Sequence, residues 1–295
     1  MIEIHPTSVV DREAVIGEDV RIGPNCCIGP KVVLGDRCLL HNNVTITGNT
    51  RIGANNQFFP GCVLGCIPQD LKYRGTDTQL LIGSDNVFRE NVTVHTGTEV
   101  AGGVTKIGDH NHFLVGCHIA HDCQVGNHCI LSNQVQLAGH VCIEDRVTTG
   151  GVIGVHHFVT IGTLAYVAGF ARVTTDVPPF MIGAGQPMVQ VRGVNTVGMK
   201  RWKFPEDRID RVREAYKVLF SKRAAATGRS LQEKIAELES NGTMSDDVRY
   251  LCEFLRRSVK DGVYGRYRES LRTDTAKDRE RFYEQASTFS PETCS

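Results

Sequence analysis

The sequence has little that would point to a membrane or to nucleic acid. Lys plus Arg and Asp plus Glu are equal at 33 each among 295 residues, so the formal net charge is zero and indicates no nucleic-acid partner. There is no apolar run of about 18 residues and no leader in which a charged stretch precedes an apolar one. We therefore expect a cytoplasmic protein with no integral membrane segment.

The usual motifs of covalent and nucleotide chemistry are also missing. The chain has no GxSxG, no GxxxxGK[ST], no GxGxxG at a strand–helix junction and no CxxC pair. The chain therefore lacks the sequence signatures of the common nucleophile elbow, the phosphate loop and the thiol redox motif. No cofactor is implied.

An apolar residue at every sixth position runs through most of the chain between Ile4 and Val173. A period of six fits neither an α-helix, with 3.6, nor a flat strand, with 2, and a short fixed repeat is the signature of a solenoid. Thr149 is the single polar residue in the second run. The first run is Ile4, Val10, Ile16, Ile22, Ile28, Leu34, Leu40, Ile46, Ile52, Phe58 and Leu64, resuming at Ile82, Phe88 and Val94, and the second goes from Ile107 to Val173.

Three such hexads predict a triangular coil, and stacked coils pair their strands in parallel. Two gaps interrupt the repeat. We expect residues 66–81 to leave the prism for one whole coil and return to the same face, and residues 98–106 to form a second loop. Insertions in a repeat array usually mark its functional face.

Eleven cysteines would suggest disulfides or zinc, but the repeat argues for a structural role. Six of them fall at the small inward position, where a thiol acts as a small hydrophobe. These are Cys26, Cys38, Cys62, Cys117, Cys123 and Cys129.

The repeat ends near Val173, and residues 180–204 are expected to be irregular because Pro178 and Pro179 cannot continue a ladder. Helices are predicted from Pro205, from the capping box at Ser230 to Gly242, and after Ser245. We therefore divide the chain into a β-helix over 1–195, a helical domain over 196–261 and a loosely attached charged tail over 262–295. A short helix is expected near Asp274–Gln285.

Histidines are concentrated in one part of the chain, with nine of eleven between His95 and His157. His121, His140 and the pair His156–His157 recur about one coil apart, which predicts a line down one edge of the prism. A neutral imidazole is the usual general base near pH 7. This pattern favours direct attack of a substrate hydroxyl or amine on an activated acyl group, without a covalent intermediate.

Two other interpretations of the histidines stay open. Exposed corner histidines can simply cap the array. Alternatively, His118 and His121, with a third ligand from another subunit, could hold Zn²⁺ as in the γ-class carbonic anhydrases. The sequence lacks a separated His partner with an acidic residue behind it, so no metal is assigned.

Six strings in order resemble the acyl-carrier-protein–UDP-N-acetylglucosamine O-acyltransferases, which carry out the first step of lipid A synthesis. The resemblance runs from about residue 4 to 260 and implies a left-handed parallel β-helix followed by a small helical domain. The strings are PQDLKY at 68–73, HIAHDCQVGN at 118–127, LAGHV at 137–141, GG at 150–151 with VH at 155–156, DVPP at 176–179, and GVN at 193–195 with KR at 200–201.

The resemblance implies that His121 is the general base, that Asp122 orients it, and that the amide of Gly139 stabilises the oxyanion. Tyr166 and Gly169 would line the groove for the acyl chain. Residues implied in substrate binding are Gln69, Asp70, Lys72, His118, His140, His156, His157, Asn195 and Arg201. Two departures concern the nucleotide: His157 stands where the family usually has Gln, and Val197 where it often has an acidic residue.

The resemblance also implies partners. The acyl donor would be acyl carrier protein, the acceptor UDP-N-acetylglucosamine, and the active sites would lie between the subunits of a homotrimer. The segment 200–223 has nine Lys/Arg and four Asp/Glu, so it offers a basic surface for an acidic carrier protein. An amino-sugar acceptor, a zinc enzyme and a non-catalytic scaffold remain alternatives.

Overall fold

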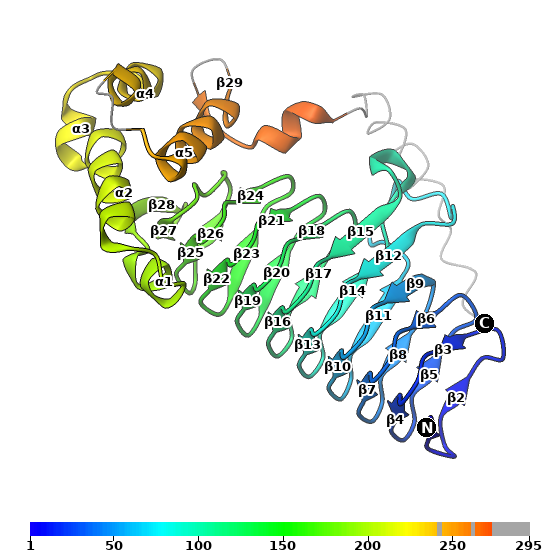
Figure 1. Cartoon of the computed structure of the whole chain (residues 1–295). Helices are drawn as coiled ribbons and strands as arrows, with labels where there is room; N and C mark the ends of the chain where they lie inside the picture. The colour runs from blue at the N-terminus through cyan, green and yellow to red at the C-terminus, as the bar shows by residue number, and fades with distance from the viewer. Residues whose placement is uncertain (241–243, 261–262, 273–295) are drawn as a thin grey trace.

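The computed structural model describes residues 1–240, 244–260 and 263–272. Most strands are very short, and they stack into a three-sided prism that rises from the N-terminus (Figure 1). The three faces are three long sheets, parallel throughout except at the last pair of strands.

The strands of each face are as follows. The first face consists of β1 (Glu3–Ile4), β4 (Arg21–Ile22), β7 (Leu39–Leu40), β10 (Gln57–Phe58), β13 (Val87–Phe88), β16 (His112–Phe113), β19 (Ile130–Leu131), β22 (Thr148–Thr149), β25 (Tyr166–Val167), β27 (Met181–Ala184) and β28 (Gln190–Val194). The second face consists of β2 (Val9–Val10), β5 (Cys27–Ile28), β8 (Thr45–Ile46), β11 (Val63–Cys66), β14 (Thr93–His95), β17 (His118–Ile119), β20 (Val135–Leu137), β23 (Ile153–Val155) and β26 (Arg172–Val173). The third face consists of β3 (Val15–Ile16), β6 (Val33–Leu34), β9 (Asn49–Ile52), β12 (Gln79–Ile82), β15 (Val104–Ile107), β18 (Gln124–Val125), β21 (Cys142–Ile143) and β24 (Thr160–Ile161).

The register confirms that one coil consists of three hexads. Ile4 pairs with Ile22 and Phe113 pairs with Leu131, each 18 positions apart. Pairings that span an insertion are longer: on the first face, Phe58 with Phe88 spans 30 positions, and Phe88 with Phe113 spans 25. The chain therefore carries an insertion in each of these two coils, and the coils above and below still stack.

Both expected loops are shorter than predicted, and the first also connects different faces. Cys66 ends β11 and Gln79 begins β12, so the first excursion is 67–78. Because β11 belongs to the second face and β12 to the third, the chain does not return to the face it left, as we had expected. The second excursion is 96–103, since Val104 already begins β15; it contains the short 3-10 helix η1 (Glu99–Ala101).

Both excursions leave the prism at the same edge. We call the connections from a second-face strand to the next third-face strand corner 2–3. The excursion 67–78 follows β11 and the excursion 96–103 follows β14, one coil later. Two successive coils thus carry additional chain at this edge, and the histidines of the next coils lie along the same edge.

The core is the column of large apolar residues inside the prism. The rings of Phe58, Phe88 and Phe113 stack with centroids 5.0 and 4.9 Å apart, and all three side chains are fully buried. The six inward cysteines are buried, as predicted. Burial raises the pKa of the Cys62 thiol to about 12, so it stays protonated and unreactive.

The segment 180–204 is ordered, contrary to the expectation of irregular chain. β27 and β28 pair antiparallel as a hairpin that closes the top of the first face, and α1 (Thr196–Arg201) follows. The prolines stop the short-strand ladder but leave the hairpin free to form. The side chain of Asn195 caps α1 by accepting a hydrogen bond from Gly198 N.

The predicted helices are present. They are α2 (Glu206–Leu219), whose N-cap is Pro205, α4 (Leu231–Ser240) and α5 (Asp246–Arg257), with the short α3 (Lys222–Ala226) between the first two. Ser230 and Glu233 form the predicted capping box: Glu233 N donates to Ser230 Oγ, and Ser230 N to Glu233 Oε2. The predicted helix end at Gly242 lies outside the described residues.

The described part of the expected loose tail is packed. The strands β29 (Val259–Lys260) and β30 (Val263–Tyr264) form a hairpin, and the 3-10 helix η2 (Tyr267–Leu271) runs back over the prism (Figure 1). Tyr264 Oη donates to the carbonyl of Asp176. The short helix predicted near Asp274–Gln285 lies outside the described residues.

Within residues 1–240, 244–260 and 263–272, no helix combines the length and the apolar content that crossing a bilayer would require.

Truncating the central ring of the aromatic column should destabilise the prism. We expect Phe88→Ala to lower the free energy of unfolding by about 3–5 kcal/mol, because the cavity cannot close between the stacked rings above and below. The control is Val9→Ala, a strand residue that is 67% exposed, which should stay within about 0.5 kcal/mol of the parent. Urea unfolding at one fixed protein concentration measures both, and equal losses would contradict a core role for the aromatic column.

Candidate active site

The predicted line of histidines lies along corner 2–3. His121, His140 and the pair His156–His157 each follow a second-face strand on successive coils. The rings of His121 and His140 meet edge to face at 5.1 Å. Three histidines of the concentrated region lie elsewhere, since His110 and His128 stack with each other at another edge and His112 is on the first face.

His121 is held by the carboxylate of its sequence neighbour Asp122. His121 Nδ1 lies 2.8 Å from Asp122 Oδ2, and both side chains are buried. Neighbours in an extended strand would face apart, but Asp122 has a φ of +60°, in the left-handed region. The corner geometry therefore brings together two side chains that the sequence alone would separate.

The excursion 96–103 fixes the other side of Asp122. Thr98 N donates to Asp122 Oδ1 at 2.7 Å, and Thr98 Oγ1 donates to Oδ2 at 2.6 Å. Asp122 N in turn donates to Thr105 Oγ1 at 2.8 Å. A carboxylate oxygen accepts hydrogen bonds, so the contact with Asp122 assigns the donor role to Nδ1 of His121 and leaves Nε2 as the ring atom on the side of Asp70.

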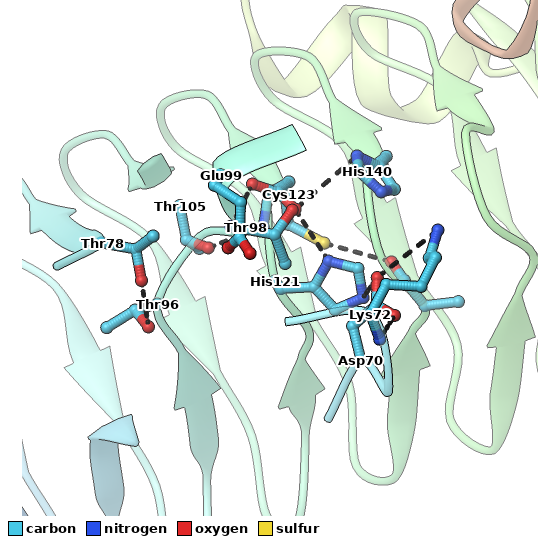
Figure 2. Close-up of polar contacts among 12 residues, drawn as sticks. Asp70, Lys72, Thr78, Thr96, Thr98, Glu99, Thr105, His121, Cys123 and His140 are labelled. Carbon is cyan, nitrogen blue, oxygen red and sulfur yellow. Dashed lines mark hydrogen bonds and ion pairs between the residues drawn. The ribbon is translucent and has the colours of Figure 1, made fainter. Parts of the chain in front are cut away.

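The excursion 67–78 brings an acidic side chain, Asp70, and a basic one, Lys72, to the open side of His121. Asp70 Oδ2 lies 3.9 Å from His121 Nε2 and 3.7 Å from Lys72 Nζ (Figure 2). Glu99, on the second excursion, accepts hydrogen bonds from Arg74 N at 2.8 Å and Thr76 Oγ1 at 3.1 Å. The two excursions therefore support each other above the site.

Gly139 lies against the imidazole of His121. A Cβ added there would lie 2.5 Å from His121 Nε2, so no larger residue fits without displacing the ring. Among the described residues, no acceptor is paired with the N–H of Gly139, whereas His140 N on the same turn donates to the carbonyl of His121. A backbone N–H at this place is suited to stabilise negative charge beside the imidazole of His121.

Burial keeps the surrounding histidines uncharged. Burial lowers the pKa of His140 to about 4, and the ring stacks flat on Phe158 at 4.3 Å. Burial also lowers the pKa of His95 to about 4, and it lowers the pKa values of His118 and His157. Near neutral pH these imidazoles are therefore neutral and do not repel a proton that arrives on His121.

Two adjoining hollows meet at His121. One, of about 430 Å³, runs along the second face and is lined by residues that include Gln69, His118, Gly139 and His156. The other, of about 490 Å³, is bordered by Asp70, Lys72, His140, Phe158 and Arg272, among others. His156 and His157 border both, so the two hollows form one continuous cleft.

Four predicted residues lie away from this cleft within one chain. The Asn195 side chain donates to the carbonyl of Leu164 and caps α1, whereas Arg201 is exposed at the end of α1. Tyr166 is on the first face, and Gly169 lies at the edge between the first and second faces. None of the four lines either hollow.

Sequence reasoning missed several residues of the site. Thr98 lay in the predicted second loop but carried no signal of its own, and Phe158 follows the histidine pair without a recognisable motif. The segment 265–272 was placed in the loose tail. Arg266 and Arg272 of this segment contact the cleft, and only the three-dimensional structure shows this.

The one potential metal-binding group in residues 1–240, 244–260 and 263–272 is His121, Asp122 and His140, whose ligand atoms lie within 4.8 Å of one another. This is not the pair predicted, because His118 Nδ1 instead bonds to Thr93 Oγ1 at 2.7 Å. The fit to Zn²⁺ is poor, since Asp122 Oδ2 already accepts hydrogen bonds from His121 and Thr98.

Comparisons with known proteins match both parts of the chain. The model of the bacterial transferase hexapeptide (six repeats) matches residues 2–36 and 13–48, and that of UDP N-acetylglucosamine O-acyltransferase, domain 2, matches residues 176–264. The fold is that of a hexapeptide-repeat acyltransferase, with a left-handed parallel β-helix and a small C-terminal helical domain.

Individual relatives specify the family. An acyl-[acyl-carrier-protein]–UDP-N-acetylglucosamine O-acyltransferase of Syntrophobacter fumaroxidans is 37% identical over 262 residues, covering 89% of this chain and 99% of that protein. One from Anaeromyxobacter sp. strain Fw109-5 is 43% identical over 205 residues, covering 70% and 77%. The structure of LpxA from Acinetobacter baumannii has a TM-score of 0.82 at 39% identity and covers 89% of this chain and 98% of that one. The chain belongs to the family of acyl-[acyl-carrier-protein]–UDP-N-acetylglucosamine O-acyltransferases.

The buried His95 should make stability depend on pH. Its native pKa of about 4 lies below the usual value of 6.5, so between these limits the unfolded state binds a proton that the native state does not. Stability should therefore fall as pH drops from 6.5 to 4, with a slope from this group of at most about 1.4 kcal/mol per pH unit. In urea unfolding, His95→Leu should lose less stability over that window than the parent, and parallel curves would exclude the effect.

Proposed function

We propose that this chain transfers a 3-hydroxyacyl group from acyl carrier protein to the 3-hydroxyl of UDP-N-acetylglucosamine, with His121 as general base. The observation that carries the proposal is the position of His121 in a chain of this family. Its Nδ1 is bonded to Asp122 and its Nε2 faces the cleft. The reaction would be the first step of lipid A biosynthesis and would take place in the cytoplasm.

The chemistry follows from these contacts. The sugar hydroxyl attacks the thioester carbonyl carbon while its proton passes to Nε2 of His121. The new imidazolium is stabilised by Asp122, and the N–H of Gly139 donates to the oxyanion. The carbon–sulfur bond then breaks, and the carrier thiolate takes the proton from His121. No covalent enzyme intermediate is needed.

The other cleft residues are assigned to binding. Asp70 and Lys72 would contact the sugar and a phosphate, with Gln69 and His118 beside them. Asp70 lies on the proton-accepting side of His121, which supports a hydrogen bond to the acceptor. His140, His156 and His157 would line the same cleft as neutral donors or acceptors.

We further propose a homotrimer whose sites lie between subunits. The support is that Asn195, Arg201, Tyr166 and Gly169 are away from His121 within one chain, so a neighbouring subunit would have to bring them to the cleft. Carrier protein would dock on the basic segment 200–223. Four of its nine basic side chains have ion pairs within the chain: Lys200, Arg208, Arg213 and Lys217.

Replacing His121 should separate this proposal from its alternatives. With carrier proteins loaded with 3-hydroxyacyl chains of several lengths, the parent should form acylated UDP-N-acetylglucosamine and His121→Ala should lose at least about 100-fold in kcat. Product should also form after dialysis against chelator. Activity only with a 3-amino sugar nucleotide, or only with zinc restored, would contradict the proposal.

The role of Gly139 has its own test. Gly139→Ala should lower kcat by about 100-fold or more, because its Cβ would displace the imidazole that accepts the proton. Gly154→Ala is the matched control, since Gly154 lines the same groove but a Cβ there has no atom within 4 Å. Comparable kcat losses in the two variants would mean that the groove tolerates no added carbon at either glycine, and the specific role of Gly139 would be wrong.

A further inference from the structure

The segment Gly265–Arg272, which we call the C-terminal strap, lies beyond the residues that the family model matches. The family model ends at residue 264, immediately before it. The Syntrophobacter relative is covered over 99% of its length, whereas 89% of this chain is covered. The match to the family model therefore assigns no role to the strap.

The strap is anchored by a buried carboxylate of the prism. Asp176 Oδ2 accepts hydrogen bonds from Tyr267 N at 3.0 Å and from Ser258 Oγ at 2.8 Å, and Oδ1 accepts one from Thr160 N at 2.7 Å. The backbone adds a bond from Asp176 N to the carbonyl of Gly265. One acidic residue thus fixes the start of the strap to the last coils.

From this anchor the strap reaches the cleft. Arg266 Nη1 lies 3.0 Å from His156 Nδ1 and 3.3 Å from the carbonyl of Thr174. The guanidinium of Arg272 lies 4.9 Å from the ring centroid of Phe158, and the same ring stacks on His140. Arg272, Phe158, His140 and His121 therefore form a continuous row of contacts from the strap to the base.

Two cationic side chains border this end of the cleft. Arg272 and Lys72 border the same hollow of about 490 Å³. Of the two acids there, Glu269 is bonded to Arg266, and Asp70 lies between Lys72 and His121. The neighbouring His140 is neutral near pH 7 because burial lowers its pKa, so it adds no charge to this end of the cleft.

We propose that the C-terminal strap is a wall of the catalytic cleft and that Arg272, together with Lys72, binds a phosphate group of a substrate. The inference rests on the proposed function, in which both substrates carry phosphate: the nucleotide diphosphate of the acceptor and the phosphopantetheine of the donor. A guanidinium suits this role because it can donate two parallel hydrogen bonds to phosphate oxygens. Its stacking on Phe158 holds it in place beforehand.

The test compares two arginines of the same strap. Arg272→Ala should raise KM for one substrate by about 10-fold or more and leave kcat within about twofold, and Arg272→Lys should recover part of the loss. Arg268→Ala is the control, because Arg268 Nη1 points to Gln124 Oε1 on the third face at 3.5 Å and should leave both KM values unchanged. A rise in KM for UDP-N-acetylglucosamine assigns the phosphate to the acceptor, and a rise for acyl carrier protein assigns it to the donor.

A binding measurement separates this inference from the proposed function. UDP-N-acetylglucosamine and acyl carrier protein are each titrated by calorimetry into the full-length parent, Arg272→Ala and Arg268→Ala. Unchanged dissociation constants for both ligands in Arg272→Ala overturn the role of the strap, whatever the turnover. Equal losses in both variants also overturn it, because the strap would then be only structural. Absence of turnover in the parent overturns the proposed function instead.

Discussion

The stacking of each coil on the next, three hexads further along the chain, is the constraint on which the rest of this protein depends. A coil of three short strands has no core of its own, so its inward side chains are buried only by the coils above and below. The constant offset from Ile4 to Ile22 and from Phe113 to Leu131 keeps these columns continuous. The same rule acts on the outside, where residues one coil apart come into contact along an edge.

The cleft depends on this regular stacking of coils and on the two excursions that interrupt it. His121 and His140 meet because they occupy equivalent turns of successive coils. The residues that complete the site come from the two excursions, which bring Asp70 and Thr98 to the same edge without disturbing the columns. The rigid repeat thus carries His121, which we propose as the base, and the irregular excursions carry the groups that contact His121 and Asp122.

The histidines in the cleft differ in their electrostatic surroundings. Burial lowers the pKa of His95 and of His140 and leaves both neutral near pH 7, so that they shape the cavity without adding charge. Asp122 faces His121 and is itself bonded to Thr98 and the backbone, an arrangement suited to a base that becomes charged during reaction. The strap brings arginines to the outer side of the same row of rings, where an anion would approach from solvent.

The sequence by itself determined the periodic parts of this protein. The hexads predicted the triangular coil, the inward cysteines and the edge that carries His121 and His140, because a strict period fixes neighbours one coil away. The capping box at Ser230 and the proline at position 205 predicted helices, since both signals act within a few residues. Only the tertiary structure decided where the excursions begin and end, that Met181–Val194 forms a hairpin, that Asp122 turns toward His121, and that Arg272 reaches the cleft. Each of these depends on a corner conformation or on contacts between residues far apart in the chain, and local sequence carries no periodic signal for either.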